Sequence, residues 1–297
     1  LGDVYKRQYM SCEKRYNVSA KEVTSFKGGG NIECVVYPSN LSDLIRIYPT
    51  ADYILGCGSN MIIADEGVSG TALSTQKLTD ISYDDNYVTF GAGIKVSTLL
   101  AFAARHGMGG FEFLAGIPAS VGGLVCMNAG AFGREISDVL KDCVVVNDNG
   151  VKKYKPDSGY RGSDINGAVA QATFAYQKSE PSKIKERIFE NLKTRRIKQP
   201  SYPSCGSVFK NPEGDYAGRL IEACGFKGEI CGGAMVSDKH ANFIVNFSDA
   251  KASDFLFLVD KIKKTVYYRY RITLEEEFRL LDENHGRLSH SHGIQRL

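Results

Sequence analysis

The stretch from Gly107 to Gly133 constrains the fold of this chain more than any other feature. It holds eight of the chain's 31 glycines among apolar residues, with a single charge at Glu112. A flexible linker would be polar and would avoid large apolar side chains. Glycines among apolar residues instead indicate backbone held close to another group, because no Cβ intervenes. The stretch predicts a buried wall whose peptide groups face a ligand, with a packing corner of a β-rich domain as the alternative.

A second glycine cluster, Gly56-Cys57-Gly58-Ser59-Asn60, follows an apolar segment with strand character at 51–55. A strand that ends in such a turn can offer successive N–H groups to phosphate oxygens. The dinucleotide fingerprint of a Rossmann fold is not met, because Met61 occupies the third glycine position and no amphipathic helix follows. Taken alone, the cluster indicates a hairpin turn more readily than a phosphate site.

Length and composition are those of an ordinary globular protein. With 297 residues, 43% hydrophobic and 24% charged, the chain is long enough for two or three lobes. A formal charge of +3 does not indicate a nucleic-acid partner. No apolar run reaches the roughly 18 residues of a membrane-spanning helix, and no signal-peptide pattern opens the sequence. We therefore expect a cytoplasmic protein without membrane insertion.

The eight cysteines form no Cys-x-x-Cys pair and have no zinc-like spacing with histidine. We expect reduced, mostly buried thiols and no metal site. Three histidines, His285, His290 and His292, lie near the C-terminus, where a solvated tail is a better account than a metal site. Residues 1–18 are expected to form a disordered N-terminal segment.

Periodic patterns predict a mixture of helices and strands. Helical spacing occurs at 41–48, capped by Ser42, and at 96–105, 181–197, 216–224 and 253–266, the last capped by Ser253. Strand patterns occupy 81–91, 143–154, 169–176, 241–246 and 272–281. Two prolines mark a boundary at 198–204. The irregular alternation favours an α+β class over a doubly wound sheet.

Several polar positions could carry chemistry, although each has a simpler explanation. The residues alone favour Ser207 as a turn serine that satisfies local backbone. The guanidinium fork of Arg161 would suit a carboxylate or phosphate, but most such arginines are surface charges. Strand alternation places Glu275 and Glu277 on one face, for which a solvated edge is the simpler account. The basic run at 183–198 is expected to be a solvated helix face, with its last members in reach of an anionic ligand.

Taken together, these segments resemble one family, the UDP-N-acetylenolpyruvoylglucosamine reductases, over roughly residues 22 to 282. The order and spacing of short motifs carry the resemblance, and each motif is weak alone. The motifs are Thr24-Ser-Phe-Lys-Gly-Gly-Gly30, Leu55-Gly-Cys-Gly-Ser-Asn60, Gly116-Ile-Pro-Ala-Ser-Val-Gly-Gly123, Met127-Asn-Ala-Gly-Ala-Phe-Gly133, Tyr160-Arg-Gly-Ser163, Gln199-Pro200, Gly206-Ser-Val-Phe-Lys-Asn-Pro212, Ala217-Gly-Arg-Leu-Ile-Glu222, His240-Ala-Asn-Phe243 and Leu274-Glu-Glu-Glu277.

The resemblance implies an FAD-binding lobe of the vanillyl-alcohol-oxidase (PCMH) type at 19–198. A smaller α+β substrate lobe would occupy 199–282, followed by a tail at 283–297. It further implies non-covalent FAD, with NADPH as hydride donor. The implied reaction reduces UDP-N-acetylglucosamine enolpyruvate to UDP-N-acetylmuramate, in peptidoglycan precursor synthesis. A monomer is expected.

The family pattern also implies the site residues. Ser207 would donate the proton that completes reduction, while Arg161 and Glu277 would stabilise the enolic intermediate. Cofactor contacts are expected from Gly56, Gly58, Ser59, Asn60, Ile117, Pro118, Ser120, Gly122, Gly123, Asn128 and Ala131. Substrate contacts are expected from Tyr160, Lys198, Lys210 and Asn211.

The chain departs from the family pattern at Cys57 and Ala119, where glycine is frequent, and at Glu276, where proline is frequent. It lacks a tyrosine-bearing loop between Arg161 and Ser207, which indicates the shorter subtype with a more open substrate channel. Two alternatives remain. An FAD oxidase of the same superfamily is disfavoured because no early histidine could tether the flavin. A nucleotide-sugar-binding protein without catalysis is disfavoured because all three catalytic residue types are present.

Overall fold

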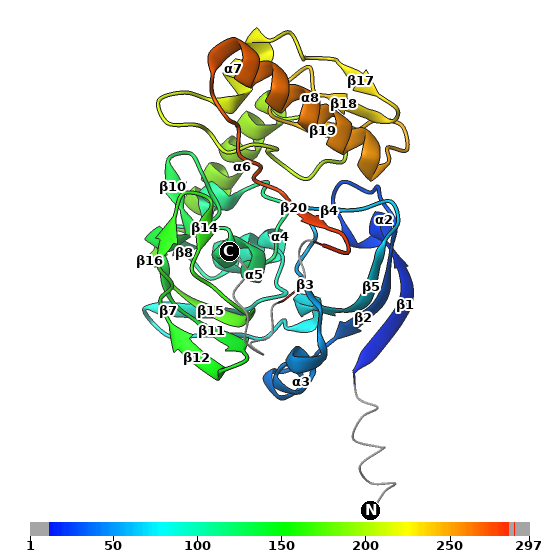
Figure 1. Ribbon diagram of the computed structural model, residues 1–297. Coiled ribbons are helices and arrows are strands. Elements are labelled where there is room, and N and C mark those ends of the chain that lie inside the picture. The colour runs from blue at the N-terminus through cyan, green and yellow to red at the C-terminus, as the bar shows by residue number, and fades with distance from the viewer. Residues whose placement is uncertain (1–11, 285–287, 289–297) are drawn as a thin grey trace, which may run out of the picture.

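The computed structural model describes residues 12–284 and residue 288. It has two lobes, and the chain passes from the lower to the upper lobe after helix α6 (Pro181–Lys198) (Figure 1). The lower lobe contains two separate sheets, and the upper lobe packs a long helix beside a small sheet. Its mixed content agrees with the predicted α+β class. The tail histidines His285, His290 and His292 lie outside the described residues.

The first sheet of the lower lobe has the order β1-β2-β5-β3, with β1 antiparallel to β2 and the other neighbours parallel. These strands are β1 (Glu13–Ser19), β2 (Asn31–Tyr37), β5 (Val68–Ser74) and β3 (Tyr53–Leu55). The prediction of disorder up to residue 18 is therefore wrong for residues 13–18. Their ladder to β2 is regular, but Val18 is the one buried position in β1, so no hydrophobic alternation revealed the strand.

Two short helices adjoin this sheet, α2 (Ala20–Val23) and α3 (Leu41–Ile47). The sequence predicts Ser42 as the N-cap of α3, but the N-cap lies two residues earlier and the first helical residue is Leu41. Asn40 is the cap, and its side-chain oxygen accepts the N–H of Asp43 at 2.9 Å. Both residue types cap helices well, so the local sequence offered two equivalent starts.

The second sheet is antiparallel throughout and has the order β12-β11-β15-β7-β6. Its strands are β12 (Gly150–Tyr154), β11 (Leu140–Asn147), β15 (Ala168–Ala175), β7 (Tyr87–Gly91) and β6 (Ile81–Tyr83). Helices α4 (Val96–Arg105) and α5 (Val121–Cys126) share its hydrophobic core. The strand patterns predicted at 81–91 and 143–154, each of which forms a hairpin in the structure, and the helix predicted at 96–105 are confirmed.

Short pieces complete the lower lobe. The two-residue strands are β8 (Met108–Gly109), β16 (Gln177–Lys178), β9 (Gly130–Ala131), β10 (Arg134–Glu135), β13 (Ser158–Gly159) and β14 (Gly162–Ser163). Single 3₁₀ turns lie at Tyr48–Thr50, Thr75–Lys77, Glu112–Leu114 and Ile136–Asp138. The pair β13–β14 matters most for the site, because its turn carries Arg161.

The upper lobe contains α7 (Ala217–Ala223), α8 (Ala252–Tyr270) and a sheet of order β17-β18-β19. The strands are β17 (Ile230–Cys231), β18 (Ala234–Val236) and β19 (Ile244–Asn246). The strand predicted at 272–281 is confined to β20 (Arg279–Leu281). β20 lies within the predicted 199–282 region, yet it pairs in parallel with β4 (Met61–Ile63), which follows the first glycine turn of the lower lobe.

Direct contacts hold the two lobes in a fixed relation. The rings of Phe26 and Phe255 meet edge to face at 5.2 Å, and Nδ2 of Asn246 donates to the carbonyl of Phe26 at 3.0 Å. Asp65 of the lower lobe accepts the first N–H groups of α8, from Ala252 at 2.7 Å and Ser253 at 3.0 Å. The prediction that Ser253 caps α8 is wrong. Lys251 is the N-cap residue, and the carboxylate that serves the first turn comes from the other lobe.

Candidate active site

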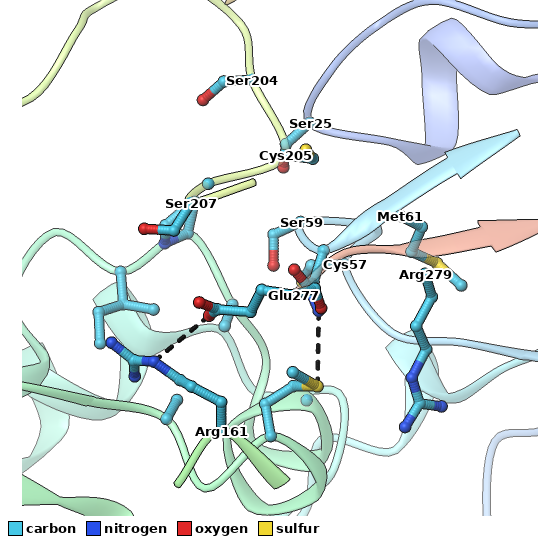
Figure 2. A pocket seen from close by; sticks show the side chains of 18 of the residues that line it. Ser25, Cys57, Ser59, Met61, Arg161, Ser204, Cys205, Ser207, Glu277 and Arg279 are labelled. Atoms are coloured by element: carbon cyan, nitrogen blue, oxygen red, sulfur yellow. Dashed lines mark hydrogen bonds and ion pairs between the residues drawn. The ribbon is translucent and has the colours of Figure 1, made fainter. Parts of the chain in front are cut away.

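A cavity of about 1260 Å³ lies between the lobes and is lined by residues of both. The two glycine-rich segments form its lower wall, and the segment 199–207 with the turn at 239–243 forms the upper part. Figure 2 shows that the side chains of Ser207, Glu277 and Arg161 reach the same region from different elements. A cavity of this size is suited to a large cofactor or substrate.

The first glycine turn presents free backbone donors. In the part of the chain that the structure describes, no hydrogen bond forms from the N–H groups of residues 57–60. Gly58 has a φ of +60°, and a Cβ there would lie 1.9 Å from the carbonyl oxygen of Val23. Only glycine fits, because the turn is pressed against the chain behind it. Unpaired N–H groups in such a turn suit the oxygens of a diphosphate.

The second glycine-rich segment lies close to the first. An ideal Cβ on Gly56 would lie 3.1 Å from the Ser120 hydroxyl, and one on Gly122 would lie 3.1 Å from the Ala92 methyl group. The N–H groups of Val121 and Gly122 are already bonded to carbonyls of residues 94 and 92. The 116–123 segment therefore lets a ligand approach its backbone closely, while the hydrogen-bond donors come from the N–H groups of the 57–60 turn.

Most of the predicted cofactor positions line the cavity. They are Gly56, Gly58, Ser59, Asn60, Ile117, Pro118, Ser120, Gly122, Gly123 and Ala131. Asn128 does not line it. Its amide nitrogen donates to the Glu135 carboxylate at 2.7 Å and the Gly159 carbonyl at 3.0 Å, and its oxygen accepts the Ser137 N–H at 3.1 Å. Asn128 therefore supports the loop that carries Arg161.

Arg161 and Glu277 form the charged centre of the cavity. Nε of Arg161 lies 3.3 Å from Oε1 of Glu277, and Nη1 donates to the carbonyl of Gly130 at 3.3 Å. The Glu277 side chain is only 13% exposed. Burial raises the pKa of Glu277, against the lowering effect of Arg161 and Lys210. A carboxyl group in this setting takes up a proton more readily than one in water.

Ser207 lies opposite this pair, on a segment fixed by a buried amide. Asn242 accepts the N–H of Phe209 through Oδ1 at 2.9 Å and donates to its carbonyl through Nδ2 at 2.7 Å. The carbonyl of Asn242 also accepts the N–H of Val208 at 2.9 Å, and Glu277 donates its N–H to Val208 at 2.8 Å. Ser207 and Glu277 are thus positioned by the same short stretch of chain. The sequence contained Asn242 in a family motif but gave it no role.

The predicted substrate residues divide into two groups. Tyr160 and Asn211 line the cavity. Lys198 is exposed at the end of α6 and does not line it. Lys210 does not line it either, and its Nζ is 3.4 Å from Oε2 of Glu275. The prediction missed five lysine and arginine residues that do line the cavity, and these are Lys27, Arg195, Arg219, Lys239 and Arg279.

The cysteine of the first glycine turn is not activated. Burial raises the pKa of the Cys57 thiol, and the Ser120 hydroxyl and the charge of Lys95 oppose this only in part. A thiol in this state is a poor nucleophile at neutral pH. The residue that replaces the frequent glycine therefore contributes a small side chain to the wall.

Comparisons with known proteins agree with this geometry. A model of the C-terminal domain of UDP-N-acetylenolpyruvoylglucosamine reductase matches residues 199–281, and a model of an FAD binding domain matches residues 32–153. The reductase of Clostridium botulinum (strain Langeland) is 39% identical over 280 residues, covering 90% of this chain and 92% of the relative. That of Halalkalibacterium halodurans is 38% identical over 286 residues, covering 91% and 95%.

A solved structure has the same fold. The crystal structure of UDP-N-acetylenolpyruvylglucosamine reductase from Thermus caldophilus superposes with a TM-score of 0.79 at 34% identity, over 91% of this chain and 99% of that chain. The predicted α+β class and FAD-binding lobe are confirmed.

Proposed function

The chain belongs to the family of UDP-N-acetylenolpyruvoylglucosamine reductases, which are FAD-containing oxidoreductases, and from this membership we propose its reaction. It reduces the enolpyruvyl ether of UDP-N-acetylglucosamine to the lactyl ether of UDP-N-acetylmuramate, with NADPH as hydride donor. The product serves peptidoglycan precursor synthesis. The convergence of Ser207, Arg161 and Glu277 on one cavity is the observation that carries the proposal.

The walls of the cavity fit FAD. The unpaired N–H groups of residues 57–60 would hold its diphosphate, and the wall at 117–123 would pack against it. When bound, FAD supplies the hydride chemistry that links NADPH to the enolpyruvyl group. The protein's own groups must then manage the negative charge and the proton.

Arg161 and Glu277 would act on the carboxyl end of the enolpyruvyl group. Addition of hydride to its terminal carbon moves negative charge through the α carbon into the carboxylate. The guanidinium of Arg161 would counter this charge, and Glu277, whose pKa burial raises, would share a proton or a hydrogen bond with the carboxyl group of the intermediate. Donors already aimed at a developing oxyanion are worth about 3–4 kcal/mol each.

Ser207 would complete the reaction by giving its hydroxyl proton to the α carbon. Its segment is held on Asn242 and Val208, so the hydroxyl keeps a fixed place relative to Glu277. A positioned proton donor contributes roughly 10²–10⁴-fold to such a step.

An anaerobic visible spectrum tests this function. The FAD-loaded protein receives one equivalent of NADPH and then the enolpyruvyl UDP sugar. We expect flavin absorbance to bleach with NADPH and return with the sugar. Bleaching without return would contradict the substrate, and a flavin that NADPH leaves oxidised would contradict the donor. Return with oxygen but not with the sugar would favour an oxidase.

We also propose that the protein works as a cytoplasmic monomer. Within the described residues, no helix is long and apolar enough to cross a membrane. The cavity is lined by residues of one chain from both lobes. Light scattering during size exclusion checks the state, and a mass of twice 32.6 kDa would contradict the monomer.

A further inference from the structure

Arg195 is a half-buried cation that the family motifs did not single out. It lies in the last turn of α6, beside the exposed residues Arg196 and Lys198, yet it lines the cavity. Its Nη1 donates to Oε1 of Gln199 at 3.1 Å. Its Nε is buried and has no hydrogen-bond partner among the described residues. Buried donors of this kind usually have a partner, so Arg195 has bonding capacity to spare.

Packing fixes where this guanidinium lies. Gly116 has a φ of +80°, and a Cβ there would be 2.8 Å from Cδ of Arg195. The stem of Arg195 is thus pressed against the first residue of the 116–123 wall. On its other side the guanidinium lies 6.0 Å from the centre of the Phe132 ring. Arg195 therefore lies between the 116–123 segment and the loop at 130–132. The Gly130 carbonyl of that loop accepts a hydrogen bond from Arg161.

The charges around Arg195 are not balanced. Arg161 has Glu277 as a carboxylate partner at 3.3 Å. Arg195 makes no ion pair within residues 12–284. Burial lowers its pKa, and the neighbouring charge of Arg161 lowers it further. Arginine nevertheless stays protonated in proteins, so the cavity keeps a half-buried cation that has no carboxylate partner among the described residues. Such a charge is costly unless a ligand anion neutralises it.

We propose that Arg195 is an anion-binding residue of the active site, whose guanidinium pairs with a planar, delocalised anion in the cavity. The inference rests on the proposed function. A guanidinium fork fits a group that offers two acceptor atoms in one plane. Two sources in the cavity share that chemistry, the N–C=O edge of the reduced flavin and the carboxylate of the enolpyruvyl group.

The test uses Arg195→Met in the FAD-loaded protein, with Arg196→Met as the matched control. Methionine keeps most of the stem and removes the charge, and Arg196 is its exposed neighbour on α6. Two equilibrium quantities are measured, the midpoint potential of the bound flavin and the Kd of the enolpyruvyl UDP sugar for the oxidised enzyme. Neither requires turnover.

The two sources give different results. If the anion is the flavin, Arg195→Met lowers the midpoint potential by about 30 mV or more, a tenfold loss of preference for the reduced cofactor, and leaves the Kd unchanged. If it is the substrate carboxylate, the Kd rises at least tenfold at constant potential. Arg196→Met changes neither. Wild-type values of both quantities in Arg195→Met would overturn the proposal.

A second variant covers the case in which Arg195→Met does not retain FAD. Arg195→Lys keeps the charge and the stem but loses the fork. A change in the midpoint potential or in the Kd of the sugar in Arg195→Lys supports the proposal. Wild-type values of both in this variant refute it. Failure of the proposed function is separate, because it shows in the wild-type protein as a flavin that does not respond to NADPH or to the sugar.

Discussion

Ser207 is the single residue whose replacement should separate the two halves of the proposed reaction. Reduction of the flavin by NADPH needs no proton from Ser207, whereas reoxidation by the sugar does. We expect Ser207→Ala to leave the rate of flavin reduction by NADPH within twofold of wild type. The same substitution should slow flavin reoxidation by the sugar by roughly 10²–10⁴-fold. Stopped-flow absorbance of each half-reaction checks this. Ser182→Ala, at an exposed serine of α6 that does not line the cavity, is the control, and equal loss in both half-reactions would remove the assignment.

Glu277 should make the stability of the protein depend on pH in a defined direction. Burial raises its pKa in the folded state, although Arg161 and Lys210 oppose the shift. Its contribution is complete below the unfolded-state pKa and is lost as the pH rises through the folded-state pKa. Glutamine has no such dependence. The Tm of Glu277→Gln minus that of the wild type should therefore increase as the pH rises above the unfolded-state value of 4.5. Differential scanning calorimetry measures both Tm values. A Tm difference that falls as the pH rises would show that the ion pair with Arg161 lowers the pKa of Glu277 more than burial raises it.

At the scale of elements, α8 depends on an acceptor from the other lobe. Burial alone would raise the pKa of Asp65, but hydrogen bonds from Ser253 and Ala252 and the charge of Lys251 outweigh it and lower the pKa. The stabilisation is present above the unfolded-state pKa and is lost as the pH falls through the folded-state pKa. Asp65→Ala should reduce the free energy of unfolding by about 1–2 kcal/mol near neutral pH, as for other caps.

Urea denaturation of Asp65→Ala measures this loss against Asp260→Ala. Asp260 makes an exposed ion pair with Lys264 one turn along α8, which is worth about 0.3–0.5 kcal/mol. Equal effects of the two substitutions would mean that Asp65 does not act as a cap.

The cap of α8 and the phase of α6 show where sequence reasoning reaches its limit. Ser253 is a sound local cap, but the group that serves the helix is 187 residues away from Ala252. Only tertiary structure brings it there. In α6 the apolar stripe is short: Ile184, Ile188 and Leu192 pack against the core of the lower lobe, and only Ile184 is fully buried. The prediction took Lys198 from the family pattern, although Arg195, three residues after Leu192, continues this face. The glycine turns and Ser207, Arg161 and Glu277 were found because each belongs to a contiguous motif.

At the scale of the whole molecule, the two lobes are interleaved. β20 returns from the upper lobe and pairs with β4, whose first residue Met61 directly follows the turn with the free N–H groups. The N–H of Arg279 also donates to the carbonyl of Asn60 at 2.9 Å. The contiguous division into 19–198 and 199–282 could not anticipate this, because a three-residue strand at the end of a polar segment carries almost no pattern.

Removal of β20 should therefore release the cofactor. We expect a chain that ends at Phe278 to lose most of its FAD on desalting, because Asn60 and β4 lose their partners. A chain that ends at Leu288 keeps β20 and the bond from Leu288 to Asp52, and it should retain FAD as the full chain does. The flavin-to-protein absorbance ratio measures both. Full retention in the shorter chain would show that the turn is fixed without β20.

The pairing of β20 with β4 also sets an order of events during synthesis. The glycine turn leaves the ribosome well before the strand that fixes it, because β20 follows β4 by more than two hundred residues. A nascent chain can form the sheet of β2, β5 and β3 and still lack the finished cradle, since domains fold progressively as they emerge. Stable loading of the cofactor then waits until β20 has been translated and has paired with β4.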